Sequence, residues 1–564
     1  LGFLAVLVGA FVAFNMAQFA VTRRRALLGR LRCMGCTSRA LLGAVLAEAA
    51  VLGLGGGALG LGLGAVLARA LGPVGGVPLP ELDALAIVGA LVVGMVASLV
   101  ATLLPARAAA TTPPVAVAGQ VREEQALPLR VPLGLGLASA LLLVPTGSPI
   151  LLPACAVLGV LLSSATLTPW LLGRLLRRRH GPIVLSLAAG RLTRSLGRTG
   201  VAAGALAMPL AMTIAVLVMV GSFRGEVDAW SRSVLGGDVY VKPLDLELAP
   251  QTLRIDQTDI TTWEAHPSVL AVDRLRLTEA GGDQGSFVLG GGKLEMMRRR
   301  GALRVLDGPE PDVIADQLDA GEVMISEPLA RRRALGPGDT LELVGRDGPV
   351  GITVAAVFQD FSFDRGFALL SEHVFIEHFG PIPVRSVAIL LNDPREADAF
   401  AREVADEHPE LEVTTVAQLR EDVLVAFEDT FALTWVLQGI ATTLALVGVL
   451  TALLCLHLER RQELGVLRAL GARSRRVGAL VLTEATIITG LAALLAVPTG
   501  LVLAWILVAV VNTRSFGWSF PLVIEPGPVA GVGLMAVAAG LLAGVVPWIM
   551  ARRSAPAHLL EDPT

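Results

Sequence analysis

Long apolar runs alternate with short arginine-rich stretches over most of this chain. A run of about 20 apolar residues can cross a hydrocarbon core of about 30 Å as a helix. Runs of this kind lie at residues 1–21, 41–71, 82–104, 201–222, 430–457, 479–511 and 527–550. Two shorter runs, 131–146 and 150–173, flank the turn-like sequence PTGSP and predict a helical hairpin. The pattern therefore predicts an α-helical membrane protein with about nine spans.

Residues 223–428 follow a different pattern. Short segments rich in β-branched residues lie between Gly, Asp and Pro, which is typical of strands. Such segments occupy residues 236–241, 321–328, 339–345, 351–358 and 387–392. Residues 396–407 instead have helical spacing. We expect one mixed α/β domain here, large enough to bury its own core.

Composition supports a membrane protein. Of 564 residues, 54% are hydrophobic and 17% charged, and the mean hydropathy is +0.67, which is too apolar for a soluble chain of this size. Residues 223–428 carry a net charge of about −17 and the remainder about +14. Arginines in short loops stay on the cytoplasmic side, so we expect residue 1 and the acidic domain outside and the C-terminus inside.

A basic segment occurs twice, at Thr22–Glu48 and Leu458–Glu484. In constant register, Arg24, Arg25, Leu28, Gly29, Leu31, Arg32, Gly35, Ser38, Arg39 and Glu48 match Arg460, Arg461, Leu464, Gly465, Leu467, Arg468, Gly471, Ser474, Arg475 and Glu484. A proline-led tail follows each unit, starting at Pro105 and at Pro547. This is an internal repeat. The second unit also has an earlier span, 201–222, before the α/β domain, and the first unit has no counterpart of it. Because the chain also begins with Leu1, we expect a missing N-terminal portion and ten spans in full.

The basic segment predicts an amphipathic helix at a membrane boundary. Leu464, Leu467 and Leu470 form one stripe, and the arginines face elsewhere. Anchoring on anionic headgroups is one interpretation. Headgroup attraction requires charge but no fixed register, whereas docking into the groove of a partner requires both. The repeated register therefore favours docking.

ERRQELGVLRALGARSRR, followed by a span that carries a glutamate and by the proline-led tail, resembles the FtsX-like permease family of ABC transporters. The stretch from LARRRALGPGDT to DRGFALL resembles the extracytoplasmic domain of MacB-type permeases, and SLAAGRLTRSLGRTGVAAGALAM resembles the entry helix and first span of such a unit. The resemblance implies these domains: 1–119, an incomplete first FtsX-like unit; 120–182, linker and hairpin; 183–222, entry helix and span; 223–428, the MacB-like domain; 429–564, the second unit.

The resemblance also implies coupling helices at about 460–477 and 24–40, which receive the movement of an ATPase. The candidate ATPase-coupling residues are Arg460, Arg461, Glu463, Leu464, Leu467, Arg468, Leu470, Gly471, Arg24, Arg25, Leu28, Leu31, Arg32 and Gly35. In the first copy Leu27 replaces Glu463, and Cys33 and Cys36 replace alanines. We therefore expect the two copies to dock unequally.

The resemblance implies a permease subunit in the bacterial inner membrane that moves a lipoprotein, lipid, peptide or antibiotic-like substrate. The alternative is a regulator that transports nothing and connects an ATPase to a periplasmic hydrolase or sensor kinase. No phosphate-binding loop is visible, so ATP and magnesium are expected on a separate ATPase dimer. A periplasmic adaptor or substrate-accepting protein would be a further partner, and nucleic acid is not expected.

We expect no catalytic residues and no metal site in this chain. Cys33 and Cys36 lack the further ligands that a structural zinc site needs, and the repeat places alanine at both positions. The cluster from Glu372 to His378 lacks metalloprotease spacing and is typical of a solvated helix face.

Two glutamates, Glu48 and Glu484, lie inside apolar spans, where an ionisable group is usually paired. We expect pairing with Arg39 or Arg475 of the same segment rather than a proton relay, because no further acid continues a path. In the span after the first copy, Gly53 with Gly57 and Gly60 with Gly64 have the spacing that lets helices approach closely.

Overall fold

The computed structural model describes residues 27–75, 83–110, 128–144, 151–176, 182–194, 196–244, 255–282, 285–293, 303–363, 365–428 and 470–553, with scattered single residues at 9–24, at 299 and at 431–466. The chain divides into two compact units. Unit 1 comprises Leu1–Val220, Asp429–Leu507 and Val523–Thr564, and unit 2 comprises Gly221–Glu428 and Val508–Leu522. Each unit is described by itself.

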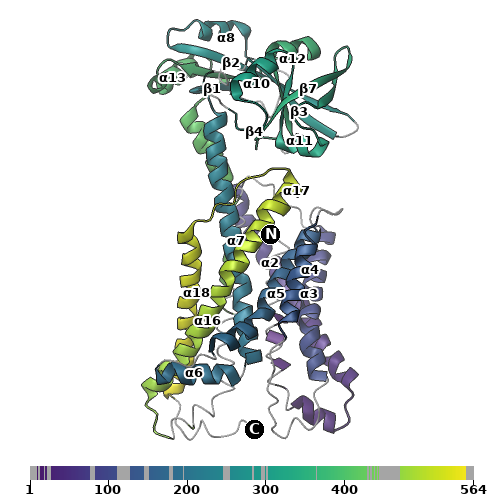
Figure 1. The fold of residues 1–564 in the computed structure, drawn as a ribbon, viewed down its shortest axis with the longest axis vertical. Helices are drawn as coiled ribbons and strands as arrows, with labels where there is room; N and C mark the ends of the chain where they lie inside the picture. Colours follow the sequence, from purple (N-terminus) through teal and green to yellow (C-terminus); the bar gives the residue numbers. More distant parts are fainter. Residues whose placement is uncertain are drawn as a thin grey trace. The chain divides into compact units, whose positions relative to one another are not determined.

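Unit 1 is helical (Figure 1). Its helices are α2 (Ser38–Gly75), α3 (Ala84–Ala110), α4 (Arg130–Leu141), α5 (Leu151–Leu176), α6 (Ile183–Arg194), the first part of α7 (Leu196–Val234), α16 (Ser474–Trp505) and α18 (Pro526–Arg553). Within the described part of the chain, five helices are long and apolar enough to span a membrane, with shorter apolar helices at Arg130–Leu141, Ile183–Thr193 and Pro526–Leu542. The runs at 1–21 and 430–457 fall largely outside the described residues, so nine spans stay a prediction.

The helix pairs of the two repeat copies pack in corresponding ways. A Cβ on Gly53 of α2 would lie 2.8 Å from Ser98 Cβ of α3, which confirms the close approach predicted at this glycine. In the second pair the roles are exchanged: Thr489 of α16 holds the repeat position of Gly53, and a Cβ on Gly540 of α18 would clash with it. No described atom lies within 4 Å of a Cβ built on Gly60 or Gly64, so that predicted approach is not part of this contact.

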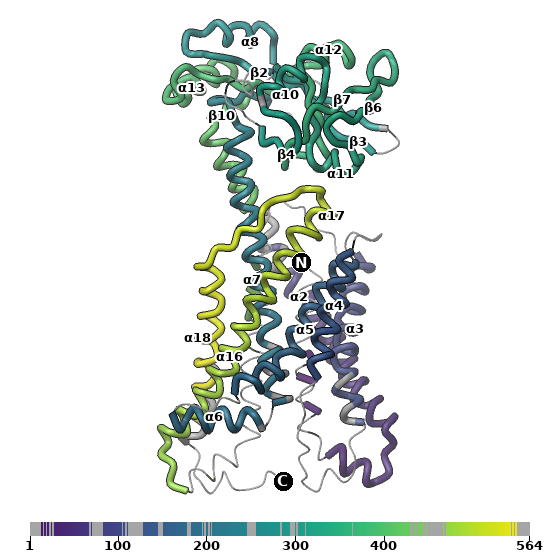
Figure 2. The backbone as a smooth tube through the Cα atoms, in the orientation of Figure 1, coloured from purple at the N-terminus to yellow at the C-terminus, as the bar shows by residue number. Residues whose placement is uncertain are grey.

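Helices α4 and α5 form the predicted hairpin. Ser163 Oγ of α5 donates a hydrogen bond to the carbonyl of Pro132 near the start of α4, at 2.7 Å, and Gly159 of α5 faces Ser139 near the end of α4. The two helices therefore run antiparallel, side by side, as the tube drawing also shows (Figure 2). The hydroxyl of Thr499 in α16 donates to Ser164 Oγ of α5 at 2.9 Å, which joins the hairpin to the second repeat copy.

Unit 2 is built on a ten-stranded mixed sheet in the order β10-β1-β9-β2-β3-β8-β5-β7-β4, with β6 paired to β7. The strands are β1 (Val239–Pro243), β2 (Val269–Gly282), β3 (Gly285–Gly292), β4 (Val305–Asp307), β5 (Val323–Ser326), β6 (Thr340–Gly345), β7 (Gly348–Phe358), β8 (Phe367–Ser371), β9 (Ser386–Leu391) and β10 (Leu411–Thr415). The pairs β3/β8 and β5/β7 are parallel and the others antiparallel. Strands β1, β5, β6, β7 and β9 confirm the five predicted strand segments.

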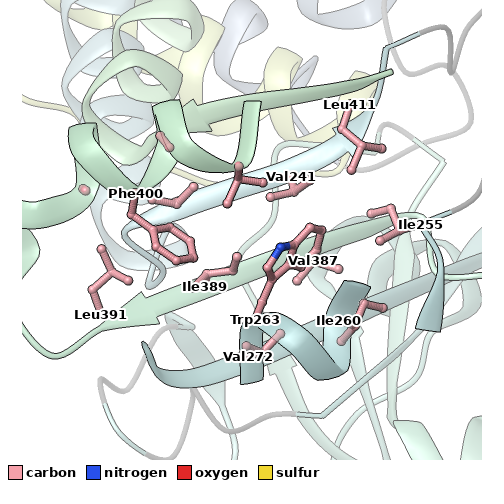
Figure 3. Packing of buried hydrophobic residues seen from close by; sticks show 14 of the residues in the cluster. Val241, Ile255, Ile260, Trp263, Val272, Val387, Ile389, Leu391, Phe400 and Leu411 are labelled. Carbon is pink, nitrogen blue, oxygen red and sulfur yellow. The ribbon is translucent and has the colours of Figure 1, made fainter. Parts of the chain in front are cut away.

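Helices cover this sheet over separate hydrophobic clusters. At the β10-β1-β9-β2 end, α8 (Gln257–Glu264) and α13 (Ala397–Glu407) bury Trp263 and Phe400 (Figure 3). Burying such a side chain stabilises the fold by about 1.5–3 kcal/mol. At the other end, successive residues of β5 enter different clusters: Ile325 packs with α11 (Glu327–Arg333) and α12 (Glu372–Phe379), and Met324 packs with α10 (Pro311–Asp319). Because successive residues of a strand face opposite sides, helices cover both faces there.

Candidate coupling site

The first basic segment ends in a glycine turn. Gly35 has φ +98°, which favours glycine because a Cβ is strained there. The amide of Cys36 donates to the carbonyl of Leu31 at 3.1 Å, and that of Gly35 to Arg32 at 3.0 Å. This is the Schellman pattern that closes a helix. The segment is therefore a helix that ends at this turn, directly before α2.

The second segment has the same turn at the same repeat position. Gly471 has φ +90°, the amide of Leu470 donates to the carbonyl of Val466 at 2.9 Å, and α16 begins at Ser474. The need for a left-handed residue explains why this glycine occurs in both copies. The other candidates Arg460, Arg461, Glu463, Leu464, Leu467, Arg468 and, in the first copy, Arg25 lie outside the described residues.

Two leucines that were expected to meet the ATPase are internal packing residues. Leu28 is 8% exposed and packs with Val21 and Leu41, and Leu31 joins the same cluster. This packing holds the first segment against α2. The apolar stripe of the basic segment was expected to face a partner, but in the first copy its members Leu28 and Leu31 face the neighbouring span.

The outward-facing apolar side chains lie at the turns. Met34 is 73% exposed and Leu470 is 80% exposed, and they hold the same repeat position, one residue before the turn glycine. Leu470 was a candidate from the sequence and Met34 was missed. The repeat register could have found it, because only the register shows that Met34 corresponds to Leu470. Arg30, Arg39, Arg473 and Arg475 are exposed nearby in sequence.

The carboxylates Glu48 and Glu484 pair with arginines other than the expected ones. Glu48 Oε2 lies 2.7 Å from Arg24 Nη1, and the two side chains are 47% and 52% exposed. Glu484 Oε1 lies 3.4 Å from Arg191 Nε of α6, with side chains 6% and 12% exposed. The expected partners Arg39 and Arg475 were wrong for a geometric reason. Each is nine residues from its glutamate, which is two and a half turns of a helix, so the two side chains face opposite sides.

Arg191 is a residue that local sequence patterns could not assign. It lies on α6, which packs against α16, and almost three hundred residues separate it from Glu484. A buried arginine and carboxylate hold each other in place because removing either charge from a buried pair is strongly destabilising. The pair therefore fixes α6 to the helix that follows the second basic segment.

Unit 1 also has an open cavity of about 1080 Å³ beside the first segment. Apolar side chains of α2, α3 and the preceding segment form most of its wall, together with Gly53, Gly56, Gly57 and Gly60 of α2. The Arg24 and Glu48 ion pair lies in the same wall. An apolar surface with one ion pair suits an amphiphilic molecule better than a hydrated ion.

Two groups of residues were considered for metal binding from the sequence: Cys33 with Cys36, and the cluster of residues 372–378. Within the described ranges, no three His, Cys, Asp or Glu side chains are grouped to hold a metal ion. Cys33 and Cys36 are exposed free thiols. In the cluster of residues 372–378, Glu372 instead pairs with Arg276 at 3.2 Å, and Ser371 Oγ lies 3.1 Å from His373 Nδ1.

Comparison with known proteins identifies permeases of ABC transporters as relatives of this chain. The model of the FtsX-like permease C-terminal family matches residues 1–114 and 435–556, which are the two repeat units. The chain is 31% identical over 609 aligned positions to the uncharacterized ABC transporter permease protein Rv0987 of Mycobacterium tuberculosis, covering 100% of this chain and 69% of that protein. It is 30% identical over 158 positions to the uncharacterized ABC transporter permease YvrN of Bacillus subtilis, covering 28% of this chain and 36% of that one.

Two solved structures are similar to part of the chain. One is the periplasmic region of MacB from Actinobacillus actinomycetemcomitans, at 12% identity and a TM-score of 0.26, covering 34% of this chain and 94% of that structure. The other is the extracellular domain of the noncanonic ABC-type transporter YknZ from Gram-positive bacteria, at 16% identity and a TM-score of 0.24, covering 32% and 99%.

Proposed function

The chain belongs to the FtsX-like permeases of ABC transporters, and from that premise we propose that its two glycine turns are the contacts through which a separate ATPase moves the membrane helices. Membership makes it a multi-pass membrane protein that works with an ATPase. Family membership does not specify which residues make the contact, in which direction force passes, or what the substrate is. The proposal concerns these three points.

One observation carries the proposal: Met34 and Leu470 are both exposed, apolar and one residue before a turn of the same geometry. Protein interfaces take most of their affinity from a few such side chains that enter a pocket on the partner. Two equivalent turns in one chain match an ATPase dimer, with one turn for each subunit. ATP and magnesium are held by that dimer.

The transmission path starts at these turns. Each turn leads directly into a long apolar helix, α2 or α16, so a displacement of the turn is passed to that helix. Helices transmit such movements as rigid elements. With arginines on the cytoplasmic side of a bacterial inner membrane, the turns face the cytoplasm and the α/β unit faces outward.

The cavity in unit 1 supports an amphiphilic substrate. Its wall is mostly apolar and has only a few polar groups. Glycine and aliphatic residues of α2 and α3 form much of this wall. Such a wall fits an acyl chain or an apolar peptide segment, with the Arg24 and Glu48 pair near a polar group. A lipid, lipoprotein, peptide or antibiotic-like molecule would satisfy this chemistry.

The test measures assembly with the ATPase. Met34→Ala and Leu470→Ala should each weaken the association of the full-length permease with its ATPase by about tenfold, because truncating an interface anchor removes more than about 1 kcal/mol. Binding is measured in nanodiscs, together with the stimulation of ATP hydrolysis. Leu27→Ala is the matched control, because Leu27 is 54% exposed on the same helix but Glu463 takes its place in the second copy.

The control should bind normally. If the double variant Met34→Ala/Leu470→Ala bound the ATPase and stimulated hydrolysis as the unmodified protein does, the turns would not be the docking contacts.

A further inference from the structure

The loop that follows α16 is fastened to the α/β sheet of unit 2. After α16 the chain forms η3, a π-helix at Ile506–Asn512, then the short helix α17 (Thr513–Phe516) and an extended stretch to residue 522. Residues 508–522 belong to the compact unit that contains the sheet. Residues 513–522, which include α17, are called the 513–522 loop below. π-helical turns are rare and are often found at functional positions.

Three atoms of Ser519 form hydrogen bonds with unit 2. Its amide and its hydroxyl both donate to the carboxylate of Glu327, at 2.8 and 2.6 Å, and its carbonyl accepts a hydrogen bond from Gln359 Nε2 at 3.0 Å. Glu327 is 5% exposed and is also paired with Arg331 at 2.7 Å. Hydrogen bonds to a charged group are stronger than neutral ones. The loop is therefore anchored to the start of α11 and to the end of β7.

The preceding glycine makes this approach possible. Gly517 has φ +81°, and a Cβ built on it would lie 3.0 Å from Pro328 Cα in α11. A side chain is thus disfavoured both by the backbone conformation and by space. Glycine lets the loop turn directly against α11, which brings Ser519 within reach of Glu327.

Aromatic side chains surround the same anchor. Trp518 stacks on Phe223 of α7 with ring centroids 6.2 Å apart, and its ring meets Phe361 edge-on at 5.4 Å. Phe520 contacts Phe223 at 5.2 Å. Aromatic pairs of this kind stabilise a contact beyond the burial of their surface. The loop thus joins α11, the residues after β7 and the part of α7 that lies in unit 2.

The anchored loop is connected directly to a membrane helix. It is the direct continuation of α16, the helix that begins at the second glycine turn and carries Glu484. We propose that Glu327, Ser519 and Gln359 are positioning residues of a latch that conveys displacement of α16 to the α/β unit. This inference rests on the proposed function, because it takes the movement of α16 to be driven by the ATPase.

Two alternatives to a latch are supported by fewer of these contacts. A loop that merely covers the sheet would need apolar contact only, whereas Ser519 uses every polar group that it has on this domain. A ligand site among the aromatic rings would need space between them, whereas these rings lie in direct contact with one another.

The test uses hydrogen–deuterium exchange on the full-length chain with its ATPase in nanodiscs, with and without ATP. Glu327→Ala should speed exchange in peptides covering 517–522 about tenfold, because charged hydrogen bonds are lost. ATP should change exchange in peptides of α11 in the unmodified protein, and the variant should lose at least half of that change. Ser519→Ala, at a half-buried position, is a milder second variant that should act in the same direction.

Glu372→Ala is the matched control. Glu372 starts α12 directly after β8, as Glu327 starts α11 directly after β5, and each is preceded by a serine. Glu372 pairs with Arg276 and not with the 513–522 loop. The control should keep both the protection of residues 517–522 and the ATP response of α11.

Two results would overturn the latch: unchanged exchange at 517–522 in Glu327→Ala, or faster exchange there with a full ATP response in α11. The first measurement needs no nucleotide, so it tests the fastening even if the proposed function fails. An absence of any ATP response in the unmodified complex would overturn the proposed function and the transmission role together, while leaving the fastening result as a separate finding.

Discussion

Glu48 and Glu484 hold the same position in the two repeat copies but have different surroundings. Glu48 forms a half-exposed pair with Arg24 of its own segment, whereas Glu484 forms a buried pair with Arg191 of α6. The same residue thus closes a local contact in one copy and joins two separate helices in the other. The difference indicates that the second copy is tied more firmly into unit 1, although the two glycine turns have the same conformation.

The largest expected difference in stability between the two copies comes from removing the buried glutamate. Glu484→Ala should lower the free energy of unfolding by about 3–5 kcal/mol, because it removes the carboxylate that faces the buried Arg191 charge. Glu48→Ala should lower it by no more than about 1 kcal/mol, since that pair is half-exposed and screened. Thermal or SDS-induced unfolding in detergent compares the two variants. Equal losses would break the comparison.

A smaller effect, equal in the two copies, is expected at the turns. Gly35→Ala and Gly471→Ala should each cost about 1–2 kcal/mol, because an alanine is strained in the left-handed region. The same unfolding measurement applies, with Gly43→Ala as control, since Gly43 lies in α2 with open space around its Cβ position. A loss at one turn alone would show that the turns are not equivalent in solution.

The smallest effect concerns the cysteines of the first copy. Cys33→Ala and Cys36→Ala convert the first copy to the residues that the second copy has at these positions. Both thiols are exposed, so we expect a stability change within about 0.5 kcal/mol and no change in ATPase binding. Adding zinc or a chelator should also leave the melting temperature unchanged. A chelator-dependent shift that the double variant abolishes would contradict this view.

Much of the architecture follows from local pattern. The length of the apolar runs predicted α2, α3, α5 and α16, and segments rich in β-branched residues between Gly, Asp and Pro predicted five strands. The repeat register located the turn glycines. These features depend on neighbours within a few residues, which the sequence displays directly.

The contacts between distant elements could not be predicted in this way. The Arg191 and Glu484 pair and the Ser519 and Glu327 bonds join residues far apart in sequence, 192 residues in the second case. Neither partner is marked by periodicity or spacing. Leu28 shows the converse error: an apolar stripe on a helix does not tell which neighbour it packs against, and here α2 takes the place assigned to a partner.

The most direct measurement of the central claim is site-specific photo-cross-linking from the two turns. A photoreactive amino acid replaces Met34 or Leu470 in the full-length permease, and the complex with the ATPase is irradiated in native membranes. Both positions should form adducts with the ATPase, whereas the same group in place of Val344, which is 68% exposed in unit 2, should form none. An ATPase that co-purifies with the permease but forms no adduct at either turn would contradict the account.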